Sequence, residues 1–270
     1  MKKIKKKENK IFKIFIIIAI ATILILFGYE HFKNKYQNNN IQQTEQNVSQ
    51  LPNEENKPEE KVEEEPKEDS QMKMTIIGDI MCHNTQYNDA YVASTGTYDF
   101  SYVFNDIKDY ISSADLAIGN LETTFAGKAR GYSSYPTFNT PEELAENLKD
   151  LGIDVVSTAN NHCMDKGYKG IVSTLDYLDQ AGILHTGTSR SVQEQETVLV
   201  KEVNGIKIAF LSFTYGTNGI NIASDKSYSV NLIDDDLIVN QINLAKKENP
   251  DIICASMHWG IEYQTKQNKE

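Results

Sequence analysis

Cysteine is scarce in this sequence: only Cys82, Cys163 and Cys254 occur among its 270 residues. They form no C-x-x-C pair, and an odd number leaves at least one thiol without a partner in the chain. The sequence therefore argues against a fold held together by disulfides. We expect small buried thiols, since free cysteine is among the most buried residue types, while a bridge between Cys82 and Cys163 stays an alternative.

Aliphatic side chains are almost absent from residues 37–71. The only ones are Ile41, Val48, Leu51 and Val62. The segment is rich in Gln, Asn, Glu, Lys and Pro, and residues 54–69 hold nine acidic residues against three lysines. Such a segment buries too little apolar surface to offset the entropy lost on folding, so we predict a disordered acidic linker over residues 30–72. The formal net charge of −11 also argues against nucleic acid as a partner.

Charged residues are absent from a further segment, residues 14–28, which reads IFIIIAIATILILFG. With its flanks the apolar stretch covers 11–29, close to the roughly 20 residues that a helix needs to cross a bilayer. No small-x-small cleavage site follows it, which disfavours a cleaved signal peptide. Seven lysines within residues 1–13 predict that the basic tail, 1–10, is cytoplasmic. We therefore expect a single-pass cell-membrane protein with a transmembrane helix at 11–29 and an extracellular domain at 73–270.

The densest set of metal and phosphate ligands lies in residues 154–170, DVVSTANNHCMDKGYKG. The β-branched start predicts a short buried strand, and Gly167 opens a stretch with apolar residues at helical spacing. Asn160, Asn161 and His162 thus follow the carboxyl end of a strand, where open α/β sheets bind their ligands. Asn and Asp also cap helices and shape turns without any chemistry, but that alternative does not explain two amides followed by an imidazole.

Three more segments are typical of short buried strands, at 74–78, 115–119 and 251–256. Each one leads into polar residues, which are Asp79 and His83, then Asn120 and Glu122, and finally His258 and Glu262. Any one of these strand ends has an ordinary alternative, a solvated side chain in a turn. Four strands that each end in a metal-competent side chain are hard to explain by folding alone, and this ligand mixture suits Mn, Fe, Zn or Mg.

The rest of the sequence predicts helices and loops that connect these strands. Apolar residues recur at helical spacing in 100–113 and 237–244, and a Pro at the first helical position marks a helix at 141–152. Asn204-Gly205 between two apolar runs is a strong hairpin signal. Residues 123–139 show no period and predict a loop. In that loop Arg130 is placed to grip an anionic substrate, with a solvated side chain as the alternative.

Four motifs, GDIMCH, GNLET, STANNHCMDKG and MHWGIEY, occur in this order. With them the sequence resembles the bacterial capsule synthesis CapA family, also called the poly-γ-glutamate biosynthesis protein family, over residues 74–263. The resemblance implies an α/β fold of the calcineurin-like metallophosphoesterase type, with four layers in which two β-sheets lie between helices. Members typically have one N-terminal membrane helix. The chain departs from the phosphoesterases in having GNLE where they have a His, and the family pattern continues past HWG-x-E. The domain at 73–270 is therefore expected to be truncated at its C-terminus.

The resemblance also implies a role for each motif residue. The implied ligands of two divalent cations are Asp79, Glu122, Asn161 and His258. The implied catalytic residues are His162, Asp165 and His83. The implied substrate contacts, together with Arg130 from the loop, are Asn120, Asn160 and Glu262.

Two functions are compatible with this pattern. In the first, the chain is a metal-dependent hydrolase or transferase that serves synthesis, export or attachment of an anionic polymer such as poly-γ-glutamate. In the second, it is a non-catalytic subunit that binds the polymer or its synthase. Both imply the membrane, capsule polymer synthase or export subunits, and the polymer itself as partners. Metal content and turnover of a phosphodiester distinguish the two.

Overall fold

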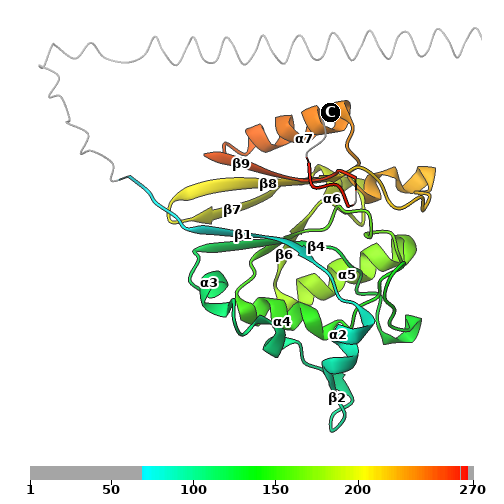
Figure 1. Cartoon of the computed structure of the whole chain (residues 1–270). Helices are drawn as coiled ribbons and strands as arrows, with labels where there is room; N and C mark the ends of the chain where they lie inside the picture. The colour runs from blue at the N-terminus through cyan, green and yellow to red at the C-terminus, as the bar shows by residue number, and fades with distance from the viewer. Residues whose placement is uncertain (1–68, 262, 267–270) are drawn as a thin grey trace, which may run out of the picture. The chain divides into compact units, whose positions relative to one another are not determined.

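Two β-sheets lie face to face, and helices cover the outer side of each (Figure 1). The computed structural model describes residues 69–261 and 263–266. The predicted tail at 1–10, the predicted helix at 11–29, the predicted linker up to residue 68 and Glu262 lie outside the described residues. Within them, helix, sheet, sheet and helix form four layers, which agrees with the predicted α/β class with two sheets between helices.

The first sheet is entirely parallel, in the order β1-β4-β5-β6. Its strands are β1 (Met74–Ile80), β4 (Leu116–Leu121), β5 (Val155–Ser157) and β6 (Leu184–Thr186). Its outer side packs against α3 (Lys108–Ser112), α4 (Glu143–Leu151) and α5 (Gly167–Ala181). Because β4 and β5 are buried on both faces, their sequences are almost continuously apolar.

The second sheet has the order β7-β8-β9. Its strands are β7 (Leu199–Val203), β8 (Ile206–Thr214) and β9 (Ile252–His258). Asn204 and Gly205, with φ angles of 51° and 78°, form the predicted hairpin turn between β7 and β8. The chain then crosses through α7 (Asp235–Lys247) to place β9 parallel to β8, and α7 covers the outer side of this sheet.

Short elements complete the described chain. They are α2 (Asn84–Asp89), β2 (Tyr91–Val92), β3 (Thr97–Tyr98), η1 (Ser101–Phe104), η2 (Lys128–Arg130), α6 (Val192–Glu196) and η3 (Ser224–Ser229). The helix predicted at 100–113 is wrong as a single helix, because η1 and α3 are separate. Four of its apolar residues are 42% to 72% exposed: Tyr102, Val103, Ile107 and Tyr110. This apolar face therefore does not pack against a core, and packing is what would stabilise one continuous helix.

The space between the sheets changes from apolar to polar along the strands. Leu116, Ile118, Val155, Ile208 and Phe210 fill it at one end. Side chains alternate in a strand, so the next inward positions toward the carboxyl ends are Asn120, Ser157, Ser212, Thr214 and His258. The strands β1, β4 and β5 run parallel to one another in the first sheet, and β8 runs parallel to β9 in the second. Contacts of His258 with Asn120 and Asn161 show that the polar positions of both sheets gather at one end of the interface.

Cysteine chemistry does not contribute to this polar end. All three cysteines are free, and Cys82 and Cys163 are buried, so the alternative bridge between them is not formed. Burial raises the pKa of Cys82 to about 11 and that of Cys163 to about 12. Both thiols are therefore protonated at neutral pH and are poor metal ligands. The expectation of small buried thiols is confirmed for these two.

The predicted membrane location needs correction. Among the residues that the structure describes, no helix is both long enough and apolar enough to cross a bilayer. The longest of them, α5, has 15 residues, fewer than the roughly 20 that a span requires. The helix predicted at 11–29 lies outside the described residues. The predicted single-pass cell-membrane location is thus not supported by the described residues.

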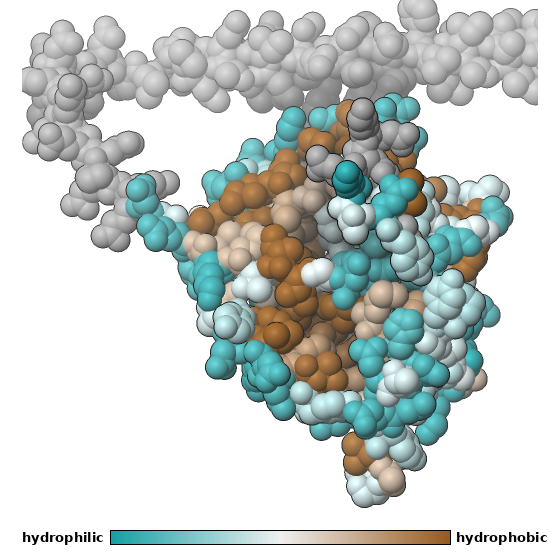
Figure 2. Space-filling view, viewed as in Figure 1, coloured by the Kyte–Doolittle hydropathy of each residue, from teal (hydrophilic) through white to brown (hydrophobic). Residues whose placement is uncertain are grey.

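Apolar side chains reach the surface on the face that Figure 2 shows, where they form a band. The outer strands of the two sheets, β1 and β9, lie on this face in Figure 1. Ile76 in β1 is 66% exposed and Ile252 in β9 is 41% exposed. Each of these strands has a neighbour on one side only in the described chain, so both keep an open edge.

Candidate metal centre

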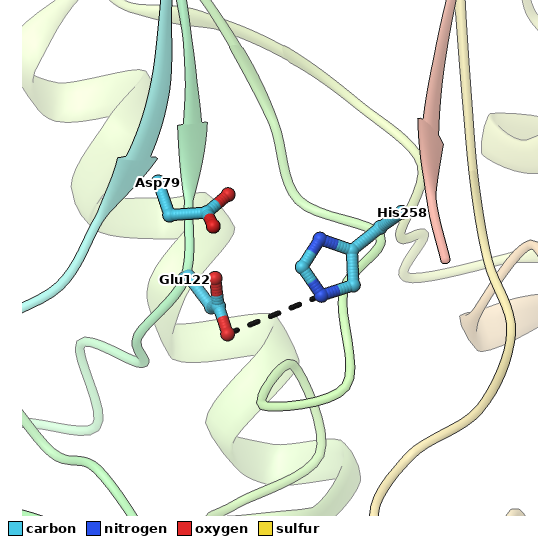
Figure 3. Close-up of side chains that lie close together, drawn as sticks. All are labelled: Asp79, Glu122 and His258. Atoms are coloured by element: carbon cyan, nitrogen blue, oxygen red, sulfur yellow. Dashed lines mark ion pairs between the residues drawn. The ribbon is translucent and has the colours of Figure 1, made fainter. Parts of the chain in front are cut away.

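Three side chains from distant parts of the chain point toward one another at the polar end of the sheets (Figure 3). Asp79 comes from β1, Glu122 follows β4 and His258 ends β9. One ligand atom from each lies within 4.8 Å of the others, and Glu122 Oε1 lies 3.9 Å from His258 Nε2. Two carboxylates held this close repel each other unless a cation or proton lies between them.

Asp79 reaches this point because β1 is irregular. The strand was predicted to end before Asp79, but it continues to Ile80, with a shift of register between Ile76 and Asp79. A bulge of this kind re-aims the side chain that follows it. The carboxylate of Asp79 is exposed, whereas Glu122 is buried and His258 lies between the two in exposure.

Asn120 connects the three strands beneath the centre. Its Nδ2 donates to Asp79 Oδ1 at 2.8 Å and lies 3.3 Å from His258 Nδ1. Its Oδ1 accepts from Ser157 Oγ at 3.0 Å and from Asn160 Nδ2 at 3.2 Å. The amide predicted to contact substrate is thus already bonded to other residues of the centre. In this arrangement it orients Asp79 and His258.

Asn161 brings an amide oxygen to the same place. Its Oδ1 lies 3.0 Å from His258 Nε2, the nitrogen that also faces Glu122. Burial lowers the pKa of His258, the charge of Asp79 acts against this, and His162 adds to the lowering. The imidazole is therefore neutral at pH 7, the state in which a ring nitrogen binds a metal. Asp79, Glu122, Asn161 and His258, the four predicted ligands, are thus brought together.

His162 and Asp165 form a buried pair next to these ligands. His162 Nδ1 lies 2.8 Å from Asp165 Oδ2, which also accepts from the backbone N–H of Phe138 at 2.6 Å. The Phe138 ring packs edge-on against the imidazole, with 4.7 Å between the ring centroids. A proton on Nδ1 leaves Nε2, 4.0 Å from Glu122 Oε1, to face the centre. The pair therefore presents one ring nitrogen in a fixed direction.

The other predicted site residues lie farther out or serve the turn. Asn160 is fully buried and donates to the carbonyl of Leu121 at 2.7 Å, while its Oδ1 accepts from the His162 N–H. His83 precedes α2, is exposed, and lies 3.2 Å from Ser134 Oγ. Arg130 is exposed, with Nη1 3.5 Å from the carbonyl of Lys166. Neither His83 nor Arg130 joins the converging ligands, and Glu262 lies outside the described residues.

Two residues of the centre were not predicted from the sequence, and both lie in the segment after β8. Asn218 accepts from Asn161 Nδ2 at 3.2 Å, and its own Nδ2 lies 3.5 Å from both ring nitrogens of His162. The Tyr215 ring stacks on His258, with centroids 6.1 Å apart. The fold accounts for this placement, because β8 is parallel to β9 and the loop after β8 therefore emerges at the same end as His258.

Two cavities are candidates for the functional site. A cavity of about 370 Å³ is lined by His162, Asp165 and Asn218 and therefore adjoins the metal centre. A larger one, about 640 Å³, lies along β6 and β7 and is lined by His185 and Glu194, among others. None of the four predicted metal ligands lines either cavity. The smaller one is lined by His162, whose Nε2 lies 4.0 Å from Glu122 Oε1, and by Asn218, which bonds Asn161, whereas His185 in the larger one pairs with Asp179 at 3.1 Å. We therefore place the functional site at the smaller cavity.

Sequence relatives point to capsule synthesis. The chain is 28% identical over 209 residues to the capsule biosynthesis protein CapA of Bacillus anthracis, covering 74% of this chain and 49% of that protein. It is also 28% identical over 204 residues to the PGA biosynthesis protein CapA of Bacillus subtilis, covering 74% and 52%. The chain thus spans about half the length of these curated relatives.

A solved structure gives a weaker likeness. A candidate 5′-nucleotidase from Staphylococcus aureus, solved with alpha-ketoglutarate, matches 71% of this chain and 38% of its own, with 15% identity and a TM-score of 0.42. That score is too low to support an argument about the fold. The family model described as bacterial capsule synthesis protein PGA_cap matches residues 73–270, most of the sequence. The chain therefore belongs to the PGA_cap family of bacterial capsule synthesis proteins, which confirms the resemblance seen in its motifs.

Proposed function

We propose that this chain is a metal-dependent hydrolase or transferase of the metallophosphoesterase-like kind, which acts on an anionic capsule polymer or its precursor. The observation that carries the proposal is the convergence of Asp79, Glu122 and His258, from three separate strands, to within 4.8 Å. Two carboxylates, an imidazole and an amide oxygen are donors that suit Mn, Fe, Zn or Mg. The chemistry of this donor set therefore fits a divalent cation.

The proposed ligands are Asp79, Glu122, Asn161 and His258. A bound cation would supply Lewis-acid stabilisation of a phosphoryl or acyl oxygen and a more acidic water. Three convergent charged or imidazole donors suffice to hold one ion. A second ion, as the sequence resemblance implies, stays part of the proposal, and its presence is tested by the metal-to-protein ratio.

The proposed acid–base group is His162, held by Asp165. Asp165 accepts from Nδ1, which keeps the other nitrogen facing the reacting atoms and stabilises the imidazolium when His162 takes up a proton. The buried position of the pair, beside Phe138, keeps bulk water away from this proton. His162 would thus give a proton to the leaving oxygen or orient the attacking water.

The test is metal content together with turnover. The purified chain, loaded with Mn²⁺, is assayed for bound metal and for hydrolysis of bis(p-nitrophenyl) phosphate. Asp79→Asn removes one charged ligand without changing its shape, and we expect a loss of metal affinity of at least about tenfold, with turnover lost in proportion. Asp236→Asn changes another exposed carboxylate, on α7, and serves as the matched control that leaves both unchanged.

The alternative, a non-catalytic subunit that binds the polymer or its synthase, predicts a different result. In that case the wild-type chain shows no turnover, and Asp79→Asn leaves polymer binding intact. Stoichiometric metal binding without turnover of any ester would leave the cation with a structural role and reject the proposed enzyme.

A further inference from the structure

We propose that Asn218 is a positioning residue, which turns the side-chain amide of Asn161 so that its oxygen faces the candidate centre. This inference rests on the proposed function, because it concerns how a proposed metal ligand is presented. An amide binds a divalent cation through its oxygen, whereas its NH₂ group only donates hydrogen bonds. An Asn side chain rotated by half a turn occupies almost the same space, so a neighbouring group has to select which end faces the centre.

Asn218 bonds the nitrogen end of that amide. Its Oδ1 accepts from Asn161 Nδ2 at 3.2 Å, while Asn161 Oδ1 lies 3.0 Å from His258 Nε2. The same His258 nitrogen lies 3.9 Å from Glu122 Oε1. With the Asn161 amide reversed, two amide oxygens would face each other at the contact with Asn218, and neither can donate. The contact therefore selects the orientation in which Asn161 can act as a ligand.

His162 in turn selects the orientation of Asn218. Asn218 Nδ2 lies 3.5 Å from both ring nitrogens of His162. Because His162 Nδ1 lies 2.8 Å from Asp165 Oδ2, the neutral ring has its proton on Nδ1 and a lone pair on Nε2. A lone pair favours the NH₂ group of Asn218 over its oxygen. One amide thus connects the acid–base pair to a metal ligand.

A tight turn presents the Asn218 side chain. Asn218 and Gly219 have φ angles of 51° and 76°, and positive values at both central residues are typical of a type I′ turn, for which Asn-Gly is the favoured pair. The Ile220 N–H donates to the Thr217 carbonyl at 2.9 Å, and Thr217 Oγ1 donates to the Ile220 carbonyl at 2.7 Å. Two hydrogen bonds therefore close the turn around Asn218.

The loop that contains this turn is attached to both sheets. The Tyr215 N–H donates to the His258 carbonyl at 3.0 Å, and the Tyr215 ring stacks on the His258 ring. Farther along the loop, Ile220 packs against the core between the first sheet and its helices. Asn218 lies between these two attachments, which fix its distance from the ligands of both sheets.

The test compares two Asn-Gly turns in the full chain. Asn218→Gly removes the side chain and keeps the backbone, because glycine adopts a left-handed φ without strain. Asn204→Gly is the matched control. Asn204 also has a φ of 51° and precedes a glycine, and its Nδ2 bonds the Gln71 carbonyl at 3.1 Å. Thermal unfolding shows that both variants are folded.

Calorimetric titration with Mn²⁺ gives the first result. We expect the affinity to fall by at least about tenfold in Asn218→Gly, as for other groups that orient metal ligands, and to stay unchanged in Asn204→Gly. Unchanged affinity in Asn218→Gly overturns the inference.

A double-mutant cycle separates positioning from a merely structural role. In Asn161→Asp both terminal atoms are oxygens, so no orientation has to be selected. Removing the Asn218 side chain in this background is expected to change the Mn²⁺ affinity by less than about twofold. An equal loss in both backgrounds would show that Asn218 acts without Asn161, which contradicts the assigned role.

A measurement without metal distinguishes this inference from the proposed function. In the metal-free protein, the side-chain N–H protons of Asn161 should exchange with solvent more slowly in the wild type and in Asn204→Gly than in Asn218→Gly, because Asn218 Oδ1 holds one of them. NMR measures this exchange, and equal rates overturn the inference. A wild type that shows the difference but binds no Mn²⁺ rejects the proposed function, while the orientation of Asn161 by Asn218 stands.

Discussion

At the scale of single residues, the centre depends on an amide rather than on a charged group. Asn120 holds Asp79 and His258 through one nitrogen and is held by Ser157 and Asn160 through its oxygen. Its side chain is almost fully buried, at 8% exposure of the residue. Removing it leaves several buried polar groups without a partner, which is costly in a protein interior.

Asn120→Ala is therefore expected to lower both stability and metal affinity. The free energy of unfolding should fall by about 1–3 kcal/mol, and the affinity for Mn²⁺ by about tenfold or more because Asp79 loses its orientation. Urea unfolding and calorimetric Mn²⁺ titration measure the two effects. Asn147→Ala is the control, since Asn147 Oδ1 accepts from the Phe100 N–H at 2.8 Å, away from the ligands. Equal effects on metal affinity in both variants would contradict the role assigned to Asn120.

His258 predicts a dependence of stability on pH in the metal-free protein. Its pKa is lowered from 6.5, chiefly by burial, so between that value and the folded pKa the unfolded chain binds more protons than the folded one. The stabilisation is thus fully present above pH 6.5 and is lost as the pH falls toward the folded pKa. Urea unfolding with a chelator, above and below pH 6.5, should show a smaller loss in His258→Gln than in the wild type. An identical pH dependence would contradict this assignment.

The sequence predicted the ligands better than it predicted their surroundings. Asp79, Glu122, Asn161 and His258 each lie at or just after the carboxyl end of a predicted strand, and parallel strands bring such positions to one edge, so their convergence was predictable. The prediction that all of these strands are buried is wrong for β1 and β9, which are edge strands with partly exposed side chains. Asn218 was not predicted, because one amide in an irregular loop carries no periodic signal. The hydrogen bond from the Phe138 N–H to Asp165 was likewise not predicted, because it joins two loops whose contact depends on the fold.

At the scale of elements, the turn after β5 is held by a close backbone approach. Gly187 follows β6 with a φ angle of 112°, and a Cβ there would lie 2.7 Å from Ala159 Cβ and 2.7 Å from Ser212 Oγ. Ala159 directly precedes Asn160 and Asn161. A side chain at Gly187 would therefore push on the turn that carries the metal ligand.

Gly187→Ala is expected to destabilise the protein through both strain and overlap. A left-handed φ costs about 1–2 kcal/mol, and forced overpacking adds about 1–3 kcal/mol. Gly182→Ala is the matched control, because Gly182 ends α5 with a φ of 72° but has open space around it, so only the first cost applies. Urea unfolding of both variants measures the difference. Equal losses of stability would show that the approach to Ala159 is unimportant.

Helices and strands were predictable where their apolar side chains are buried along the whole element, and were not predictable where those side chains are exposed. The strands β4, β5 and β8 and the Asn204-Gly205 hairpin appear where the sequence indicated them. The helix predicted at 100–113 divides because most of its apolar residues stay exposed, although Ile111 is buried. Helical spacing shows which residues share a face, but it does not show whether a core is present to receive that face.

At the scale of the whole molecule, the layered fold explains why one site forms. The two sheets share an apolar interface at one end, and the same strands present polar side chains at the other. Membership of the PGA_cap family adds the context of capsule synthesis. The bound cation is the central claim, since the proposed chemistry depends on it.

Anomalous diffraction from a crystal soaked in Mn²⁺ tests that claim most directly. We predict a peak between Asp79, Glu122 and His258, with metal–ligand distances of about 2.0 to 2.6 Å, which disappears in Asp79→Asn. A second peak nearby would establish the two-ion form. Absence of a peak at these residues, or a peak only in the larger cavity beside His185, would contradict the account.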